Sequence, residues 1–393
     1  MEKLVLIVLA GLMLISCKKE PETTPPIKAD RTVLVYMAVS NLTSQAELNL
    51  ADMAAGMEGL SGNLIVYVNR YPGNAVLYRV NDDQTMVEVA QCGKEDPASA
   101  EVLQRVWNTT VQQFPADSYG LVIWGHATGW VPADLNITNQ RSKPIGEELS
   151  QPLQCMEQQI WTQMPNALPT KAYGGKMEIS DMVAALPQDR KLDFLLFDAC
   201  FMSSIEALYD LRNTAQYIIA SPTEVMGDGF PYTDVTPLFF QETLNLQGIC
   251  QAFVDSYRYS SSVQSASVAL INTSELEPLA TAVRNLHEAF PDPTIDLDDV
   301  QPFESLTRHV FYDMEDYFKQ FAEGSSQFEA FQSQLAKTVV YSDCTDWIYS
   351  AYGAMFQCVN YCGISTYVSQ DVFPIYGAAY AETAWAKAIG MLN

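Results

Sequence analysis

Histidine is scarce in this sequence, and the cysteines are not spaced as metal ligands. The 393 residues include three histidines and eight cysteines, without a single CxxC pair. A structural zinc site needs closely spaced Cys and His ligands, so none is expected. Internal repeats and low-complexity tracts are also missing. The length suits one large domain or two ordinary ones.

Basic residues are few. Lys and Arg number 22 against 47 Asp and Glu, which gives a net charge of −25 at pH 7. Such a surface repels phosphate, so nucleic-acid binding is excluded. The acidic surface could favour basic substrates, although solubility alone also explains it. Apolar residues make up 48% of the chain, which is enough for a substantial core.

The apolar run near the N-terminus is too short for a comfortable membrane span. Residues 4–15 instead resemble the hydrophobic region of a signal peptide, residues 1–16. The stretch LISC, which ends at Cys17, resembles a bacterial lipobox and implies a lipid on that cysteine. The alternative is an ordinary signal peptide with an incidental cysteine. Residues 17–30 are polar and proline-rich, as in a flexible tether. We therefore expect an exported protein, lipid-anchored in the bacterial cell envelope and either periplasmic or surface-facing.

Seven cysteines remain beyond Cys17, and an odd number leaves at least one without an intramolecular disulfide partner. Cys344 could form a disulfide with Cys358 or with Cys362. The sequence alone leaves this pairing open.

Continuous apolar runs alternate with segments of helical spacing in the first 240 residues. Because strands that alternate with helices form a parallel sheet covered on both faces, we expect an α/β fold with a mostly parallel sheet flanked by helices. Two short runs, AVLYRV and VEVA, indicate a hairpin at its edge. The runs predicted as buried strands are residues 32–39, 63–70, 119–126, 193–199 and 216–221.

The organisation we expect is a core over residues 31–240 and a largely helical C-terminal part over 241–393, packed on the core. Strand candidates within the latter are residues 267–274 and 361–369. A polar insertion over 131–178 interrupts the core, and such long loops are usually functional or disordered.

Two of the predicted strands end in residues that carry chemistry. One ends at His126, and the other ends in FDAC, which places Cys200 at the start of a predicted helix. If the two strands are neighbours in a parallel sheet, both side chains emerge at the same edge. A nearby imidazole and a helix N-terminus both favour the thiolate, and the imidazole can protonate a leaving amine. The backbone N–H groups of Ala127 and Cys200 could hold an oxyanion.

Other interpretations of these residues stay open. His126 could be a satisfied core histidine, and Cys200 alone could be a buried structural thiol. Neither His287, at an expected surface position on a helix, nor His309 lies at a strand end.

These segments resemble the clostripain-like cysteine peptidases, the C11 group of the caspase-like superfamily. The resemblance spans about residues 31–393 and implies a caspase-like sheet with His126 and Cys200 as a catalytic dyad. The stretches that carry it are YGLVIWGHATGW, KLDFLLFDACFMSSIEALYDLR and IIASPTEVMGDGFPY, with LVYMAVSNL at the start and YCGISTYVS and AETAWAKAIG near the end.

The resemblance also implies cleavage of protein or peptide substrates after Arg or Lys. A basic side chain needs a carboxylate at the floor of its pocket. Asp198 and Asp228 occupy the matching positions, and Glu224 is a third candidate. The alternatives are a helix-start carboxylate for Asp198 and a turn residue for Asp228.

Members of this group are often activated by self-cleavage between the histidine and cysteine strands. Lys171-Ala172 is the matching bond here, with Arg141 and Lys143 as competitors. The alternative is a loop that any protease would nick. The chemistry requires no cofactor. Calcium dependence occurs in part of the group, but no clustered carboxylate loop supports it here.

The sequence departs from the group at three places. Ala127 replaces a glycine, the stretch VSNLTS lacks the acidic residue that follows the first strand, and the insertion is longer. Alanine disfavours a positive φ, so activity could be reduced if the oxyanion donor requires one. A caspase-like lipoprotein that binds without turnover is therefore the main alternative. A serine hydrolase using Ser203 or Ser204 is a second, although no G-x-S-x-G motif surrounds them.

Overall fold

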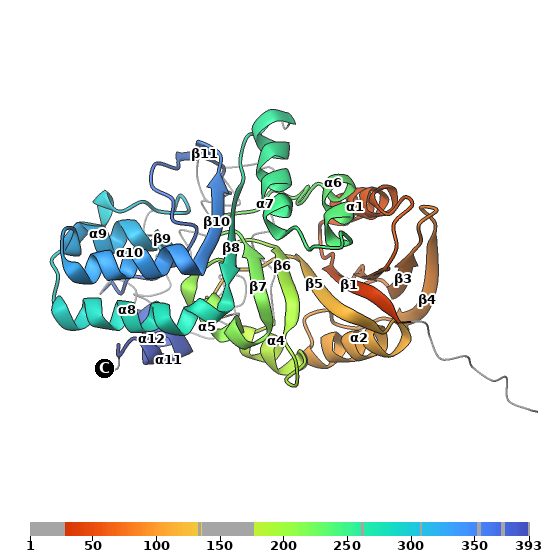
Figure 1. Ribbon diagram of the computed structural model, residues 1–393, viewed down its shortest axis with the longest axis horizontal. Coiled ribbons are helices and arrows are strands. Elements are labelled where there is room, and N and C mark those ends of the chain that lie inside the picture. Colours follow the sequence, from red (N-terminus) through yellow and green to blue (C-terminus); the bar gives the residue numbers. More distant parts are fainter. Residues whose placement is uncertain are drawn as a thin grey trace, which may run out of the picture.

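The computed structural model describes residues 28–132, 135, 177–260, 263–306, 309–351, 355–370 and 374–391. At its centre lies a nine-stranded sheet with the order β10-β8-β7-β6-β5-β1-β2-β3-β4 (Figure 1). Its strands are β1 (Ala29–Ala38), β2 (Asn63–Asn69), β3 (Ala75–Val80), β4 (Met86–Gly93), β5 (Ala116–Gly125), β6 (Leu192–Asp198), β7 (Ala215–Ala220), β8 (Ser267–Asn272) and β10 (Val339–Cys344).

The middle of the sheet is parallel, as the sequence predicts. β2, β1, β5, β6 and β7 pair in parallel along their lengths. Their sequences are continuous apolar runs because parallel strands are buried on both faces, and all seven residues of β2 are buried. The predicted α/β fold with a mostly parallel sheet is confirmed.

Antiparallel strands extend the sheet at both edges. β3 and β4 form the predicted hairpin next to β2. At the other edge β8 pairs with β7 and β10 pairs with β8. The C-terminal part therefore adds strands to the same sheet, and one hydrophobic core runs from Val33 to Ile389.

The first strand begins earlier than the sequence indicates. Ala29 and Asp30, assigned to the tether of residues 17–30, already belong to β1. The reason is a partner remote in sequence: Ala29 pairs with Ala116, and its N–H donates to the carbonyl of Pro115 at 2.9 Å. The signal peptide, Cys17 and the rest of the tether lie outside the described residues.

Helices cover both faces of the sheet. α1, α6 and α7 lie on one side, and α2, α4 and α5 lie on the other (Figure 1). α2 begins where Ser99 accepts a hydrogen bond from the N–H of Val102, a typical N-cap. In the described part of the chain, no helix is long and apolar enough to cross a membrane. These helices are α1 (Thr43–Gly56), α2 (Ala100–Gln113), α4 (Ile179–Ala185), α5 (Ile205–Asp210), α6 (Tyr232–Phe239) and α7 (Leu246–Asp255).

The remaining elements gather beyond the β8 and β10 edge and around α5. Short antiparallel pairs link them, β13 with β9 and β11 with β12. These elements are α8 (Leu276–Ala289), β9 (Tyr312–Asp313), α9 (Met314–Ala322), α10 (Ser326–Thr338), β11 (Trp347–Ile348), β12 (Phe356–Gln357), β13 (Ser365–Thr366), α11 (Pro374–Glu382) and α12 (Ala384–Ala388).

A buried carboxyl group joins this C-terminal part to the core. Glu206 on α5 is fully buried and accepts a hydrogen bond from the N–H of Tyr367 at 2.8 Å. Burial raises the pKa of Glu206 to about 7, because the charged form loses its hydration. The folded protein therefore holds a proton here that the unfolded chain releases at lower pH.

Glu206→Gln should flatten the pH dependence of stability. A carboxyl whose pKa is raised on folding stabilises the fold below its unfolded pKa, near 4.5, and loses that contribution as pH rises through about 7. We expect the free energy of unfolding of the wild type, relative to the variant, to fall by roughly 3 kcal/mol between pH 4.5 and pH 8. Urea titrations across this range measure the difference.

Glu58→Gln is the matched control, because Glu58 is exposed and its substitution should leave the pH profile unchanged. Parallel profiles for the wild type and Glu206→Gln would contradict the assignment.

Candidate active site

The register of two central strands brings the predicted site residues to one edge. β5 and β6 are parallel neighbours, and Trp124 is paired with Asp198. His126 and Cys200 each follow two residues later. Since neighbouring strands lie about 4.8 Å apart, the two segments leave the sheet side by side.

A close contact beyond the strand ends confirms that the two segments stay together. Gly129 has a φ of +62°, and a Cβ on it would lie 2.6 Å from the carbonyl oxygen of Phe201. The ring of Phe201 stacks on Phe311 with centroids 4.6 Å apart. Glycine is therefore required at position 129 by both its backbone angle and the space available.

The prediction that Cys200 starts a helix is wrong. α5 begins at Ile205, and Phe201 has a φ of +60°, outside the helical region. The backbone N–H groups of Phe201 and Ser203 donate to the carbonyls of Thr223 and Ser221, each at 3.0 Å. These bonds to the segment after β7 hold residues 200–203 in a turn, so a helix dipole does not act directly on the sulfur.

The thiol of Cys200 has a different electrostatic partner. The side chain is fully buried, and its Sγ accepts a hydrogen bond from the N–H of Val225 at 3.1 Å. An N–H donor stabilises a thiolate more than a thiol. The backbone of Val225 therefore meets the sulfur twice, because its carbonyl also accepts from the thiol at 3.7 Å.

His126 is half-buried and has a partner that sequence reasoning missed. Its Nε2 lies 2.6 Å from Oδ1 of Asn41, in the loop after β1. An amide oxygen only accepts, so Nε2 carries the proton and Nδ1 holds the lone pair. The sequence signal for this partner was the stretch VSNLTS, which contains Asn41 and directly follows β1. Because Ala38 at the end of β1 is paired with Gly125, this stretch leaves the sheet next to His126.

The alanine after the histidine does not distort the backbone. Among the described non-glycine residues, positive φ values occur at Ser40, Gln84 and Phe201. Ala127 therefore has a negative φ, which alanine adopts without strain. The substitution of glycine by alanine at this position costs no backbone strain in this structure.

A cavity of about 570 Å³ opens beside His126. Residues that follow β5, residues of α4 and Met202 line it, so it reaches the ends of both strands. Apolar side chains such as Trp130, Ile179 and Met182 form much of its wall. A cavity of this size can accommodate side chains of a peptide.

Asp198 and Asp228 both lie close to Tyr257. Asp198 is fully buried, and its Oδ2 accepts from the hydroxyl of Tyr232 at 2.9 Å. Asp228 is exposed, and its carbonyl accepts from Asn49 at 3.0 Å. Burial and the charges of both aspartates raise the pKa of Tyr257 well above its ordinary value. The structure thus gathers two of the three predicted carboxylates in one region.

Glu224, the third predicted carboxylate, makes contacts with the C-terminal part. It is buried, and its Oε1 accepts from the hydroxyl of Ser350 and the N–H of Ala351, each at 2.9 Å. Sequence reasoning could not find these partners, because they lie far along the chain.

The other candidate residues, His287, His309 and Ser203, make packing and hydrogen-bonding contacts of a structural kind. His287 is half-buried against Phe318, not at the expected surface position, and burial lowers its pKa. His309 pairs with the buried Glu304 at 2.7 Å. Ser203 is fully buried and donates to the carbonyl of Gly363 at 2.7 Å, as a structural serine does.

Several predicted positions lie outside the described residues, namely Lys171, Ala172, Arg141 and Lys143. Within the described ranges, no group of three or more His, Cys, Asp or Glu residues is placed to hold a metal ion.

Together the fold and the strand ends define a caspase-like α/β protein in which a histidine and a cysteine follow two neighbouring parallel strands. The sequence matches the clostripain family, Peptidase C11, over residues 35–157 and 170–381. The chain belongs to the clostripain family, and it is a cysteine-type peptidase. A search of curated proteins gives no match.

Solved structures of C11 proteases have the same fold. An inactive zymogen C11 protease from Parabacteroides distasonis is 30% identical with a TM-score of 0.74, covering 93% of this chain and 99% of its own. A secreted C11 cysteine protease from Bacteroides thetaiotaomicron, in complex with an irreversible peptide inhibitor, is 27% identical with a TM-score of 0.75. That match covers 92% of this chain and 99% of its own.

Gly129→Ala should destabilise the fold more than a glycine substitution with the same backbone angle. Gly59 is the matched control, since its φ is +68° and nothing lies within 4 Å of a Cβ placed there. Both variants are destabilised because alanine must adopt a positive φ, but only Gly129→Ala also displaces the carbonyl of Phe201. We expect it to lose about 2 kcal/mol more of the free energy of unfolding than Gly59→Ala. Equal losses in denaturant titrations would contradict this contact.

Proposed function

We propose that the protein is an endopeptidase that cleaves peptide bonds after Arg or Lys through Cys200 and His126. The observation that carries the proposal is the pairing of Trp124 with Asp198 in neighbouring parallel strands. Because His126 and Cys200 each follow this pair by two residues, both leave the sheet at the same edge. The peptidase class fits this placement, because a thiolate and an imidazole suffice for acyl transfer.

In the proposed reaction, the thiolate of Cys200 attacks the carbonyl carbon of the scissile bond. His126 carries the thiol proton and gives it to the leaving amine as the C–N bond breaks. Water, deprotonated by the same imidazole, then hydrolyses the thioester and restores the thiol. Asn41 positions the ring throughout by accepting from Nε2. The backbone N–H groups of Ala127 and Cys200 are the proposed oxyanion donors.

The proposed preference for Arg or Lys is supported by the two aspartates near Tyr257. A guanidinium or ammonium group that displaces the Tyr232 hydroxyl from Asp198 would satisfy the buried carboxylate better than a neutral partner. Asp228 would add charge from the exposed side. We assign Glu224 a positioning role, because Ser350 and Ala351 hold its carboxylate.

We further propose that the chain is activated by self-cleavage between β5 and β6, at Lys171-Ala172 or at one of the competing basic residues Arg141 and Lys143. The full burial of Cys200 supports a latent form, since a buried sulfur cannot meet a substrate. The similarity to a zymogen from Parabacteroides distasonis supports it as well.

We also propose that the protein is exported and lipid-anchored through Cys17 in the bacterial cell envelope. The signal-like residues 1–16 and the lipobox-like LISC support this location. Its partners would be proteins or peptides with basic residues, together with the membrane that holds the lipid.

Cys200→Ala and His126→Ala should each reduce cleavage of Arg- and Lys-ended fluorogenic peptides at least ~1000-fold, because each removes a group that forms or breaks a covalent bond. Nicking of the chain itself should stop in Cys200→Ala. Cys92→Ala, a half-buried cysteine remote from β5 and β6, is the control and should keep full activity. A wild-type protein that binds but does not cleave these peptides, before or after deliberate nicking, would favour the binding-module alternative.

Asp228→Asn should lower kcat/KM for Arg- and Lys-ended peptides by about 10-fold or more, because a carboxylate that pairs with the substrate cation is lost. Asp83→Asn, an exposed aspartate on the hairpin, is the matched control. If both variants cleave basic and Asp-ended peptides like the wild type, Asp228 has no part in specificity.

A further inference from the structure

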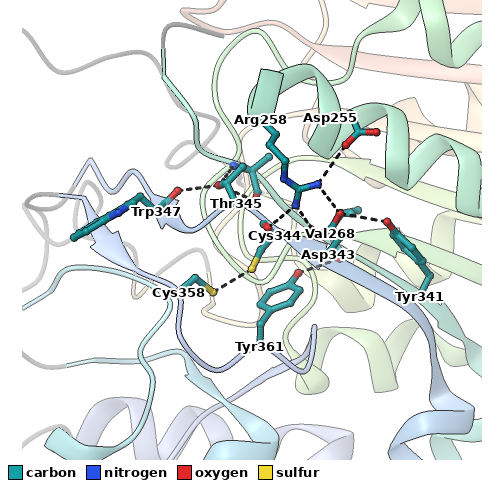
Figure 2. Close-up of polar contacts among 11 residues, drawn as sticks. Asp255, Arg258, Val268, Tyr341, Asp343, Cys344, Thr345, Trp347, Cys358 and Tyr361 are labelled. Carbon is teal, nitrogen blue, oxygen red and sulfur yellow. Dashed lines mark hydrogen bonds and ion pairs between the residues drawn. The ribbon is translucent and has the colours of Figure 1, made fainter. Parts of the chain in front are cut away.

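Two cysteines face each other at the edge of the sheet that carries β10. Cys344 is the last residue of β10, and Cys358 directly follows β12. Their sulfur atoms lie 3.4 Å apart, and both side chains are half-buried thiols (Figure 2). A disulfide needs a sulfur separation of about 2.0 Å, so a small movement suffices.

Regular backbone structure holds both cysteines in place. Cys344 pairs with Ser267 of β8, and its carbonyl accepts from the guanidinium of Arg258 at 2.8 Å. The same guanidinium pairs with Asp343 at 2.7 Å (Figure 2). On the other side, the N–H of Cys358 donates to the carbonyl of Asp346 at 2.9 Å, which extends the β11–β12 ladder. The meeting of the two sulfurs is therefore fixed by the fold.

Cys362 is a poor competitor for Cys344. It is buried, and its Sγ lies 3.2 Å from the carbonyl of Ile364. Burial and the neighbouring charge of Asp313 raise its pKa well above the ordinary value, and the contact with Cys344 together with burial raises the pKa of Cys358 as well. Cys358 is the better partner because its sulfur already lies 3.4 Å from that of Cys344 and its side chain is less buried than that of Cys362.

The segment between the two cysteines contacts the neighbourhood of the active site. Ser350 and Ala351 both donate to the carboxylate of Glu224. Val225, which follows Glu224 in the chain, donates its N–H to the sulfur of Cys200. A covalent link at the base of this segment would hold Ser350 and Ala351 against Glu224.

We propose that Cys344 and Cys358 form a disulfide that fastens the segment holding Glu224. An external low-molecular-weight disulfide is the oxidant. One thiolate of the pair attacks it and releases one external thiol, and the second thiolate then displaces the other from the mixed disulfide. The chain loses two protons and two electrons, and the external disulfide is reduced to two thiols. This site does not depend on the proposed peptidase specificity.

Peptide mapping of the full chain, equilibrated in oxidised and reduced glutathione, tests the disulfide. Cleavage after Tyr341, Trp347, Phe356 and Tyr361 separates Cys344, Cys358 and Cys362 into different peptides. We expect peptides 342–347 and 357–361 to be joined in oxidised buffer and separate after reduction. The link should survive in Cys362→Ser and disappear in Cys358→Ser.

Three outcomes would overturn the disulfide. They are a link from Cys362 to Cys344 or Cys358, a link from Cys344 or Cys358 to Cys155, and free Cys344 and Cys358 under conditions that glutathionylate Cys92. Because the wild-type map needs no substitution, misfolding of a variant cannot obscure the result.

Thermal unfolding and hydrogen exchange test the fastening role. The oxidised wild type should unfold about 4 °C above the reduced protein, since the link closes a short loop in the unfolded chain. This difference should vanish in Cys358→Ser. Amides of residues 349–351 and 224–226 should exchange several-fold more slowly in the oxidised form. Equal exchange in the two redox forms would overturn the fastening role.

Discussion

The parallel pairing of β5 with β6 is the constraint on which the rest of the site depends. Its register places Trp124 opposite Asp198, and the two proposed catalytic residues, His126 and Cys200, each follow this pair by two positions. The pairing is made of backbone hydrogen bonds between two largely buried, mostly apolar strands, so it is among the most stable parts of the core. A peptidase needs its nucleophile and its base on such a rigid support, because small displacements of either group are costly to the rate.

Contacts from outside these two strands then set the chemistry. The loop after β1 supplies Asn41 to the imidazole, and the segment after β7 supplies the N–H of Val225 to the sulfur. Gly129 and Phe201 lock the two strand ends against each other. The C-terminal part contributes through Glu206 and Glu224, which accept backbone hydrogen bonds from Tyr367 and Ala351. The edge of the sheet that carries His126 and Cys200 is thus supported by several separate segments of the chain.

Much of the fold could be predicted from the sequence because parallel strands carry an obvious signature. The runs at 32–39, 119–126 and 193–199 are mostly apolar, and all three became central strands. The same signature drew attention to His126 and Cys200, since His126 ends one of these runs and Cys200 directly follows another. Local pattern was sufficient wherever the cause was local burial.

The remaining features depend on partners that sequence spacing does not reveal. The turn at Phe201 exists because backbone groups bond to residues 221 and 223, whereas the local pattern favoured a helix. The role of Asn41 requires knowing that β1 lies next to β5, and the partners of Glu224 come from a segment more than a hundred residues later. The addition of β8 and β10 to the sheet is likewise a matter of long-range pairing.

The most direct measurement is the rate at which an irreversible Lys-ended peptide inhibitor alkylates Cys200, followed by mass spectrometry in the wild type and in His126→Ala after nicking. If the imidazole and the sulfur act as a pair, the wild type should be labelled at Cys200 at least ~100-fold faster than the variant. Equal labelling rates, or labelling at another cysteine, would contradict the account.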